Sequence, residues 1–158
     1  FRRVLFRSPE IRDYLRSREN TLTKRYRQVR EEVGKYHVKT KFVDQAPLLT
    51  NSESTPLNQS WRVGIDNKSI REIVDIYEPL IYRNSVRDVH EVGAHYRNQV
   101  GGSITGILRP THPDNGSERE LREKVLGLKE VGISDIDFYL LDAMRPRDLG
   151  WIKRAITS

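Results

Sequence analysis

The sequence repeats one pattern, in which an amphipathic helix with a polar residue at its start is followed by a short β-branched or aromatic run. Its clearest copies cover residues 69–83, 85–109 and 117–142. Strands that alternate with helices are typical of parallel α/β sheets, because a crossover helix returns the chain to the same edge. Ligands of such sheets bind at the carboxyl ends of the strands, so polar residues there are the first candidates for a site.

The two ends of the sequence need separate treatment. Residues 1–8 match a translation of a common sequencing-adapter string, and we expect them to be a non-native tail. Residues 9–158 are then one partial domain, whose upstream part we expect to be missing. The absence of Cys excludes disulfides and thiolate metal sites from this chain. The cellular compartment is left open.

The basic charge of the chain is concentrated near its start. The formal net charge is +6, and residues 1–41 hold 13 Lys and Arg against 5 Asp and Glu, whereas residues 42–158 hold 15 against 17. The excess falls on one expected helix and not on a groove or sheet that interleaves aromatics and glycines with basic residues, which indicates a solvated face, and we expect no nucleic-acid partner. No apolar run approaches the ~20 residues of a membrane span, so no membrane partner is expected either.

Turn and capping residues divide the chain into successive helix and strand segments. We expect helices over residues 9–33, 69–77, 85–100, 117–131 and 145–156, and strands over residues 36–43, 79–82, 104–108 and 136–141. The expected signals include the N-caps Ser69, Ser85 and Ser117, the apolar helix residues Ile70 and Ile73, a turn over residues 114–116 and the helix end Gly132. A long polar stretch, residues 46–64, separates the first strand from the second helix. Four parallel strands in this order fit the second half of a (β/α)8 barrel or an open doubly wound sheet. The expected missing upstream part, the regular spacing and the absence of a Gly-x-Gly-x-x-Gly loop favour the barrel.

Several short motifs carry a resemblance to a known class of barrels. They are Trp61-x-x-Gly64-Ile65-Asp66 followed by Asp75 and a strand ending at Tyr82, then Gly106-Ile107-Leu108-Arg109-Pro110, then Asp137-Phe138-Tyr139 with Leu149-x-Trp151-Ile152. Over about residues 9–158 this spacing resembles the late strands of glycoside-hydrolase-like barrels. The resemblance implies the C-terminal half of a (β/α)8 barrel and a carbohydrate substrate.

Two carboxylates follow expected strands and are the candidate catalytic residues. Cleavage of a glycoside needs two carboxyl groups on either side of the bond, separated by roughly 5–10 Å. Asp44 and Asp142 are the carboxylates at expected strand ends. The alternative for each is a structural role, because Asp after a strand often caps a helix or shapes a turn.

Other strand-end side chains are candidates for substrate binding. They are Trp61, Tyr82, Arg83, Arg109, His112 and Tyr139. The aromatic rings could stack on a sugar, or they could pack structurally at the rim of the sheet. The arginines could hold a carboxylate or a phosphate, which points to an alternative, a barrel lyase or aldolase with an anionic substrate.

The remaining expectations concern lysine chemistry, metals, a non-catalytic function and assembly. Lys39 and Lys41 lie within an expected strand and not at its end, which weakens an aldolase that forms a Schiff base. No motif marks a metal site, so we assign neither metal nor cofactor. A non-catalytic binding module that uses the basic first helix is a third possible function. Half of a barrel leaves its edges unpaired, so we expect the fragment to be inactive alone and to self-associate through those edges.

Overall fold

The computed structural model describes residues 8–45 and 64–157, which form helices and short parallel strands of an α/β protein. The chain divides into two compact units. The first consists of residues 1–42 and 47–75, and the second of residues 43–46 and 76–158.

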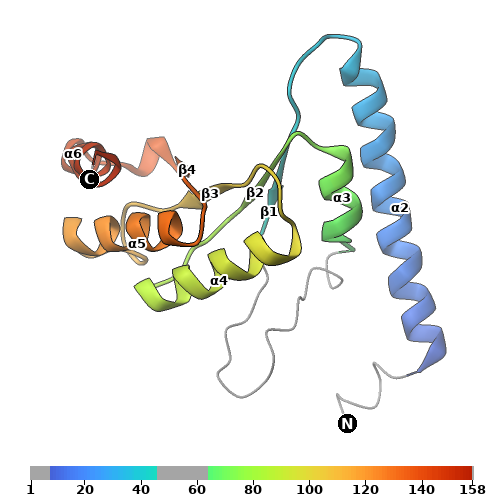
Figure 1. Cartoon of the computed structure of the whole chain (residues 1–158), viewed down its shortest axis with the longest axis horizontal. Helices are drawn as coiled ribbons and strands as arrows, with labels where there is room; N and C mark the ends of the chain where they lie inside the picture. Colours follow the sequence, from blue (N-terminus) through green and yellow to red (C-terminus); the bar gives the residue numbers. More distant parts are fainter. Residues whose placement is uncertain (1–7, 46–63, 158) are drawn as a thin grey trace. The chain divides into compact units, whose positions relative to one another are not determined.

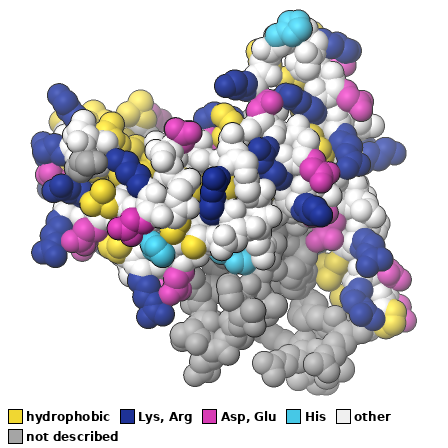
Figure 2. Space-filling model, in the orientation of Figure 1, with side chains coloured by type: hydrophobic (Ala, Val, Ile, Leu, Met, Phe, Trp, Pro, Cys, Tyr) yellow, Lys and Arg dark blue, Asp and Glu magenta, His cyan; other side chains and the backbone are white. Residues whose placement is uncertain are grey.

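A long helix, α2 (Pro9–Gly34), dominates the first unit (Figure 1). Its N-cap is Ser8, whose hydroxyl accepts a hydrogen bond from the backbone N–H of Ile11 at 3.2 Å. A residue of the expected non-native tail therefore starts this helix. The basic side chains predicted to be solvated are exposed: Arg12, Arg16, Lys24 and Arg27. Acidic and basic side chains alternate along this helix in Figure 2.

The second helix of this unit, α3 (Asn67–Ile73), differs from the prediction at both ends. We expected Ser69 as the N-cap, but the cap is Asp66, whose carboxylate accepts hydrogen bonds from the backbone N–H groups of Lys68 and Ser69. We also expected the helix to reach Tyr77, but it stops at Ile73. Two of the apolar residues assigned to its face, Ile70 and Ile73, are buried as expected.

A bidentate ion pair joins α2 to the end of this unit. The Arg30 guanidinium donates to both carboxylate oxygens of Asp75, at 2.7 and 3.0 Å. The backbone N–H and the hydroxyl of Thr40 donate to the same carboxylate, at 2.7 and 3.0 Å. The Thr40 N–H, the Thr40 hydroxyl and Arg30 lower the pKa of Asp75 against a smaller opposing effect of burial. Forked pairs of this kind fix geometry as well as charge.

The first two strands are shorter than predicted, or displaced. Strand β1 (Lys41–Asp44) begins after a turn, in which Tyr36 and Val38 are exposed, so the expected strand over residues 36–43 is wrong at its start. Strand β2 (Ile76–Pro79) begins earlier than the expected residues 79–82, and Tyr77 is fully buried in it. The two strands form one two-stranded sheet.

The rest of the second unit follows the predicted alternation closely (Figure 1). In chain order its elements are α4 (Val86–Gln99), β3 (Thr105–Leu108), α5 (Glu118–Glu130), β4 (Asp135–Phe138), the 3₁₀ helix η2 (Leu141–Ala143) and α6 (Pro146–Ile156). The predicted N-caps Ser85 and Ser117 are confirmed, since each hydroxyl accepts a backbone N–H at the start of its helix. Gly132 ends α5 with a φ of 80°, as its position after the helix predicted.

The strands of the second unit run in the same direction. Strands β3 and β4 pair in parallel register from Thr105–Asp135 to Leu108–Phe138. Parallel bridges join Tyr77 to Ile104 and Leu80 to Ile107, so β2 lies on the other side of β3. The Leu80 N–H donates to the Asp44 carbonyl at 2.8 Å, which places the end of β1 next to β2.

Leu128 on α5 is the centre of the core of this unit. It is fully buried, and a Cβ built at Gly106 of β3 or at Gly93 of α4 would lie only 2.9 or 2.8 Å from its methyl carbons. The two glycines therefore let a strand and a neighbouring helix approach α5 closely. Just after β2, Ile81 lies on the Gly106 side, and the Tyr77 ring of β2 contacts Tyr96 of α4, so both helices cover the same face.

We predict that Gly106→Ala lowers the free energy of unfolding of the second unit by about 1–3 kcal/mol, because the added methyl overpacks the core at Leu128. Urea unfolding followed by the fluorescence of Trp151, which lies in α6, measures this change. Gly34→Ala is the control, because a Cβ at Gly34 meets no atom within 4 Å. Equal stability of Gly106→Ala and the unchanged chain would contradict the packing described.

We also predict that the first unit loses stability in acid through Asp75. Its folded-state pKa is lowered, so its contribution is complete above the ordinary value of 3.8 and is lost as the pH falls through the folded value. The amide proton shift of Thr40, followed by NMR, should titrate with a midpoint below 3.8, and Asp75→Asn should abolish that titration. A midpoint at or above 3.8 would show that these hydrogen bonds do not form in solution.

Candidate ligand-binding site

Three predicted site residues meet just beyond the ends of β2, β3 and β4. Tyr82, Arg109 and Tyr139 each follow one of these parallel strands. The Cζ of Arg109 lies 4.4 Å from the centre of the Tyr82 ring. The ring of Tyr82 stacks on that of Tyr139, with 6.4 Å between their centres and 23° between their planes. We call these three residues the strand-end cluster. It lies at the edge of the sheet where ligands of α/β proteins bind.

The loop after β3 adds two polar side chains to this cluster. Asp114 and Asn115 are buried, with 7% and 3% of their surface exposed. Oδ2 of Asp114 lies 3.5 Å from Nη1 of Arg109, which is an ion pair and not a close hydrogen bond. The side-chain amide of Asn115 donates to the Arg109 carbonyl at 2.5 Å. From the sequence we predicted only a turn at residues 114–116. The signal that could have identified these two side chains is a polar pair that closely follows the strand-end Arg109.

Burial and neighbouring charges keep Tyr82 protonated. Burial raises the pKa of its phenol above 10.0, the Arg109 guanidinium opposes this rise, and Tyr139 and Asp114 add to it. The phenol is therefore a hydrogen-bond donor at neutral pH. The same influences show that Arg109, Tyr139 and Asp114 all lie within electrostatic reach of the Tyr82 hydroxyl.

Lys124, on α5, holds two of these loops. Its side chain is almost fully buried, and its ammonium donates to the carbonyls of Arg83 and Asp114, the first at 2.8 Å. Burial lowers the pKa of this amine, against the opposing charges of Asp114, Glu120 and Asp88. Lys124 is not among the predicted site residues, because a Lys in the middle of a helix gives no local signal of contact with the strand ends. It is a positioning residue for the cluster.

A second residue that the sequence analysis missed is Glu78, which lies inside β2 and is 4% exposed. Successive side chains of a strand point to opposite faces of the sheet. Tyr77 and Ile81 point to the face that the helices cover, so Glu78 shares the opposite face with Tyr82. The signal was a carboxylate within a buried strand, and it was overlooked because the preceding helix was predicted to be too long.

The candidate catalytic residue Asp44 lies in a different environment. Its carboxylate is fully buried and accepts hydrogen bonds from the hydroxyls of Tyr77, at 3.0 Å, and Tyr96, at 2.6 Å. Tyr96 belongs to α4, so this carboxylate lies in the layer between the sheet and its helices. The structure does not bring Asp44 into the strand-end cluster. Its catalytic role stays a prediction that this environment does not favour.

The other predicted site residues have varied surroundings. Asp142 is exposed in η2, and the carboxylate that caps α6 is Asp148, which accepts from the Arg145 N–H at 2.8 Å. His112 is exposed in the loop after β3. The guanidinium of Arg83 donates to the Tyr82 carbonyl at 2.8 Å. Trp61 lies outside the described residues.

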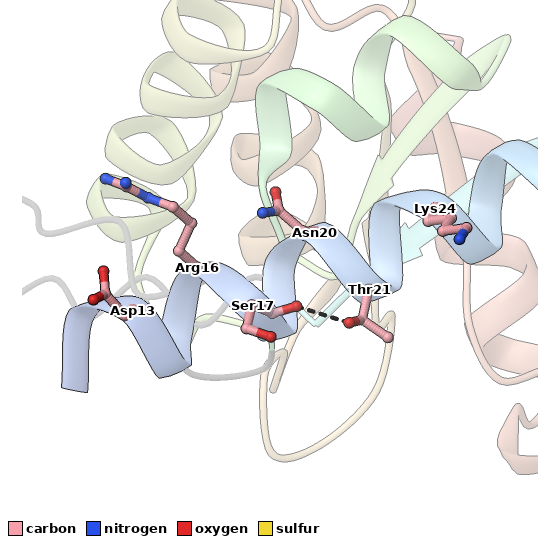
Figure 3. Close-up of a pocket in the computed structure, with 6 residues that line it drawn as sticks. All are labelled: Asp13, Arg16, Ser17, Asn20, Thr21 and Lys24. Atoms are coloured by element: carbon pink, nitrogen blue, oxygen red, sulfur yellow. Dashed lines mark hydrogen bonds between the residues drawn. The ribbon is translucent and has the colours of Figure 1, made fainter. Parts of the chain in front are cut away.

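Surface hollows also lie elsewhere among the described residues, away from the strand-end cluster. One lies on α2 and is lined by Asp13, Arg16, Ser17, Asn20, Thr21 and Lys24 (Figure 3). These side chains fan out from one helix, and the Thr21 hydroxyl is satisfied by the Ser17 carbonyl at 2.8 Å. Within residues 8–45 and 64–157, no group of three or more His, Asp or Glu side chains is arranged to hold a metal ion.

Comparisons with known proteins add no family assignment. No family model, no curated protein and no solved structure matches the chain. Among the described helices, none is both long and apolar enough to cross a membrane. The strand-end cluster and the loop residues beside it are therefore the features of this chain that bear on its function.

We predict that Lys124→Met lowers the free energy of unfolding by about 1–3 kcal/mol, because buried carbonyls lose their donor while the apolar stem is kept. The matched control is Lys153→Met, which changes an exposed Lys of α6 and should shift stability by no more than about 0.5 kcal/mol. Urea unfolding at neutral pH compares the two variants. Equal stabilities would mean that Lys124 does not hold the loops.

Proposed function

We propose that this chain is part of a carbohydrate-active hydrolase of the (β/α)8 type, and that the strand-end cluster binds the sugar. The convergence of Tyr82, Arg109 and Tyr139 carries this proposal. An aromatic face packs against the C–H groups of a sugar ring, while a guanidinium and a phenol supply hydrogen bonds to its hydroxyls. Tyr139 is 50% exposed, so its ring is accessible to such a ligand.

The strand order supports a barrel. Strands β2, β3 and β4 are neighbours in sequence order, the end of β1 lies beside β2, and α4 and α5 cover one face. Each half of a doubly wound sheet with the order 3-2-1-4-5-6 contributes only three strands before the order reverses. A succession of four without reversal is what a (β/α)8 barrel requires.

The edge of β4 supports the expected self-association. Among the described strands β4 pairs with β3 alone, and the residues after it expose much apolar surface. Tyr139, Leu140 and Leu141 are 50%, 41% and 67% exposed. An unpaired strand followed by exposed apolar residues favours contact with another chain or with further strands of the same fold.

Hydrolysis would require two carboxyl groups near the bound sugar. Asp142 remains a candidate, because it follows β4 and is exposed to solvent. Glu78 replaces Asp44 as our second candidate, because it lies on the same face of the sheet as Tyr82. Asp44, with its two tyrosine hydroxyls, is better suited to holding β1 against β2 and α4.

A lyase or aldolase with an anionic substrate is the second candidate function. The observation in its favour is that Arg109 is only loosely paired with Asp114, so its forked donors could bind a carboxylate or a phosphate. Lys124 does not supply the Schiff-base amine in this arrangement, because its ammonium is directed at two backbone carbonyls. The anionic alternative therefore depends on Arg109.

The test is a titration of the ¹⁵N-labelled chain with methyl β-glucoside and, separately, with inorganic phosphate. We expect the glucoside to shift the Arg109 Nε–H resonance. Tyr139→Ala should weaken this binding two- to tenfold, since aromatic contacts contribute about 0.5–1.5 kcal/mol. Tyr36→Ala, which changes a tyrosine that is 70% exposed in the first unit, is the control and should leave the affinity unchanged. Shifts with phosphate alone would favour the anionic substrate, and no shift with either ligand would refute both functions.

A further inference from the structure

Three buried polar atoms beside Arg109 have no hydrogen-bond partner among the described residues. They are the Tyr82 hydroxyl, Oδ2 of Asp114 and Oδ1 of Asn115. Two of the three side chains, those of Asp114 and Asn115, are more than nine-tenths buried. Buried polar groups are almost always hydrogen-bonded in folded proteins, so three atoms without a hydrogen bond beside one guanidinium, one of them ion-paired to it at 3.5 Å, indicate that another group satisfies them.

The donor or acceptor character of these atoms defines which chemical group could form their missing hydrogen bonds. Asp114 and Asn115 offer oxygen acceptors, so the missing group must donate hydrogen bonds. Arg109 and the protonated Tyr82 offer donors, so the same group must also accept. A hydroxyl does both, whereas an ammonium only donates and a carboxylate or phosphate mainly accepts.

The spacing of the ion pair favours two adjacent hydroxyls. Nη1 of Arg109 and Oδ2 of Asp114 are 3.5 Å apart, which is too long for a close hydrogen bond. Each of the two groups can therefore still form a hydrogen bond with a ligand. One hydroxyl can donate to Oδ2 of Asp114 while its neighbour accepts from Arg109. We propose that Asp114, Asn115 and Arg109 form a subsite that recognises a vicinal diol of the ligand. This subsite deepens the proposed carbohydrate-binding function and rests on it.

The backbone around the subsite is already fixed without a ligand. The N–H groups of Asp114 and Asn115 donate to the Thr111 carbonyl at 3.1 and 3.0 Å, and Lys124 holds the Asp114 carbonyl. The side chain of Asp114 is therefore not needed to close this turn. Asp114→Asn, which has nearly the same shape, should remove the charged acceptor while the loop keeps its conformation.

The experiment uses the complete chain and two matched probes, cis-1,2-cyclohexanediol and cyclohexanol. They share one ring and differ by a single adjacent hydroxyl. We expect the diol to shift the Arg109 Nε–H and Asn115 side-chain amide resonances at concentrations where cyclohexanol does not. Asp114→Asn should weaken diol binding about tenfold or more. The control Asp135→Asn, at an exposed position of β4, should not change it.

The possible outcomes separate this inference from the proposed function. If methyl β-glucoside binds and depends on Tyr139, but diol and cyclohexanol give the same shifts, the subsite is refuted and the function survives. If the diol binds through Asp114 while the glucoside does not, the subsite stands and the carbohydrate function fails. Should Asp114→Asn not fold, the comparison of the two probes on the unchanged chain still decides, and equal shifts would overturn the proposal.

Discussion

The close approach of α5 to β3 determines the geometry of the second unit. Gly106 provides no side chain on the strand, so Leu128 of α5 can lie directly against the backbone. Lys124 is one turn earlier on the same buried face of the helix, toward the N-terminus of α5. In a parallel sheet the start of a crossover helix follows the carboxyl end of a strand. The packing that buries Leu128 therefore also brings the Lys124 ammonium to the loops after β2 and β3, where the strand-end cluster lies.

Local signals predicted much of this unit, whereas contacts between distant residues decided what was missed. Ser85, Ser117 and the glycines after the helices act within one turn of chain, so their roles could be read from the sequence. Tyr77 continues the apolar spacing of α3 and was assigned to that helix for this reason. The helix stops earlier because the Asp75 carboxylate is held by Arg30 and Thr40, which are 45 and 35 positions away. No local pattern reports such a contact.

The candidate site was likewise predictable in part, where local order along the chain was sufficient. From sequence order and strand direction we expected Asp44, Tyr82, Arg109 and Asp142 to converge, because the ends of neighbouring parallel strands lie at one edge. The structure brings Tyr82 and Arg109 together with Tyr139, another of the predicted strand-end residues. Successive side chains of a strand point to opposite faces of the sheet. The face of a strand-end residue can therefore be assigned only when the limits of the strand are known. Asp44 follows Phe42 on the buried side of β1, so it points to the helix layer. Asp44 and Asp142 both follow expected strands, and both offer the carboxyl group that glycoside cleavage needs. The sequence pattern did not reveal that Asp44 is buried whereas Asp142 is exposed.

The charges of the cluster bear on the choice between a neutral and an anionic ligand. The Arg109 guanidinium lies over the Tyr82 ring and 3.5 Å from the Asp114 carboxylate, so an aromatic face and a negative charge are both beside it before a ligand binds. Lys124 brings a second positive charge, but the carboxylates of Asp114, Glu120 and Asp88 all act on it. An anion at Arg109 would lie beside the Asp114 carboxylate and would have to overcome repulsion in a partly buried setting, where charges are poorly screened. A hydroxyl group adds no charge and can bind both members of the pair. The charge balance therefore favours a neutral ligand that is rich in hydroxyl groups.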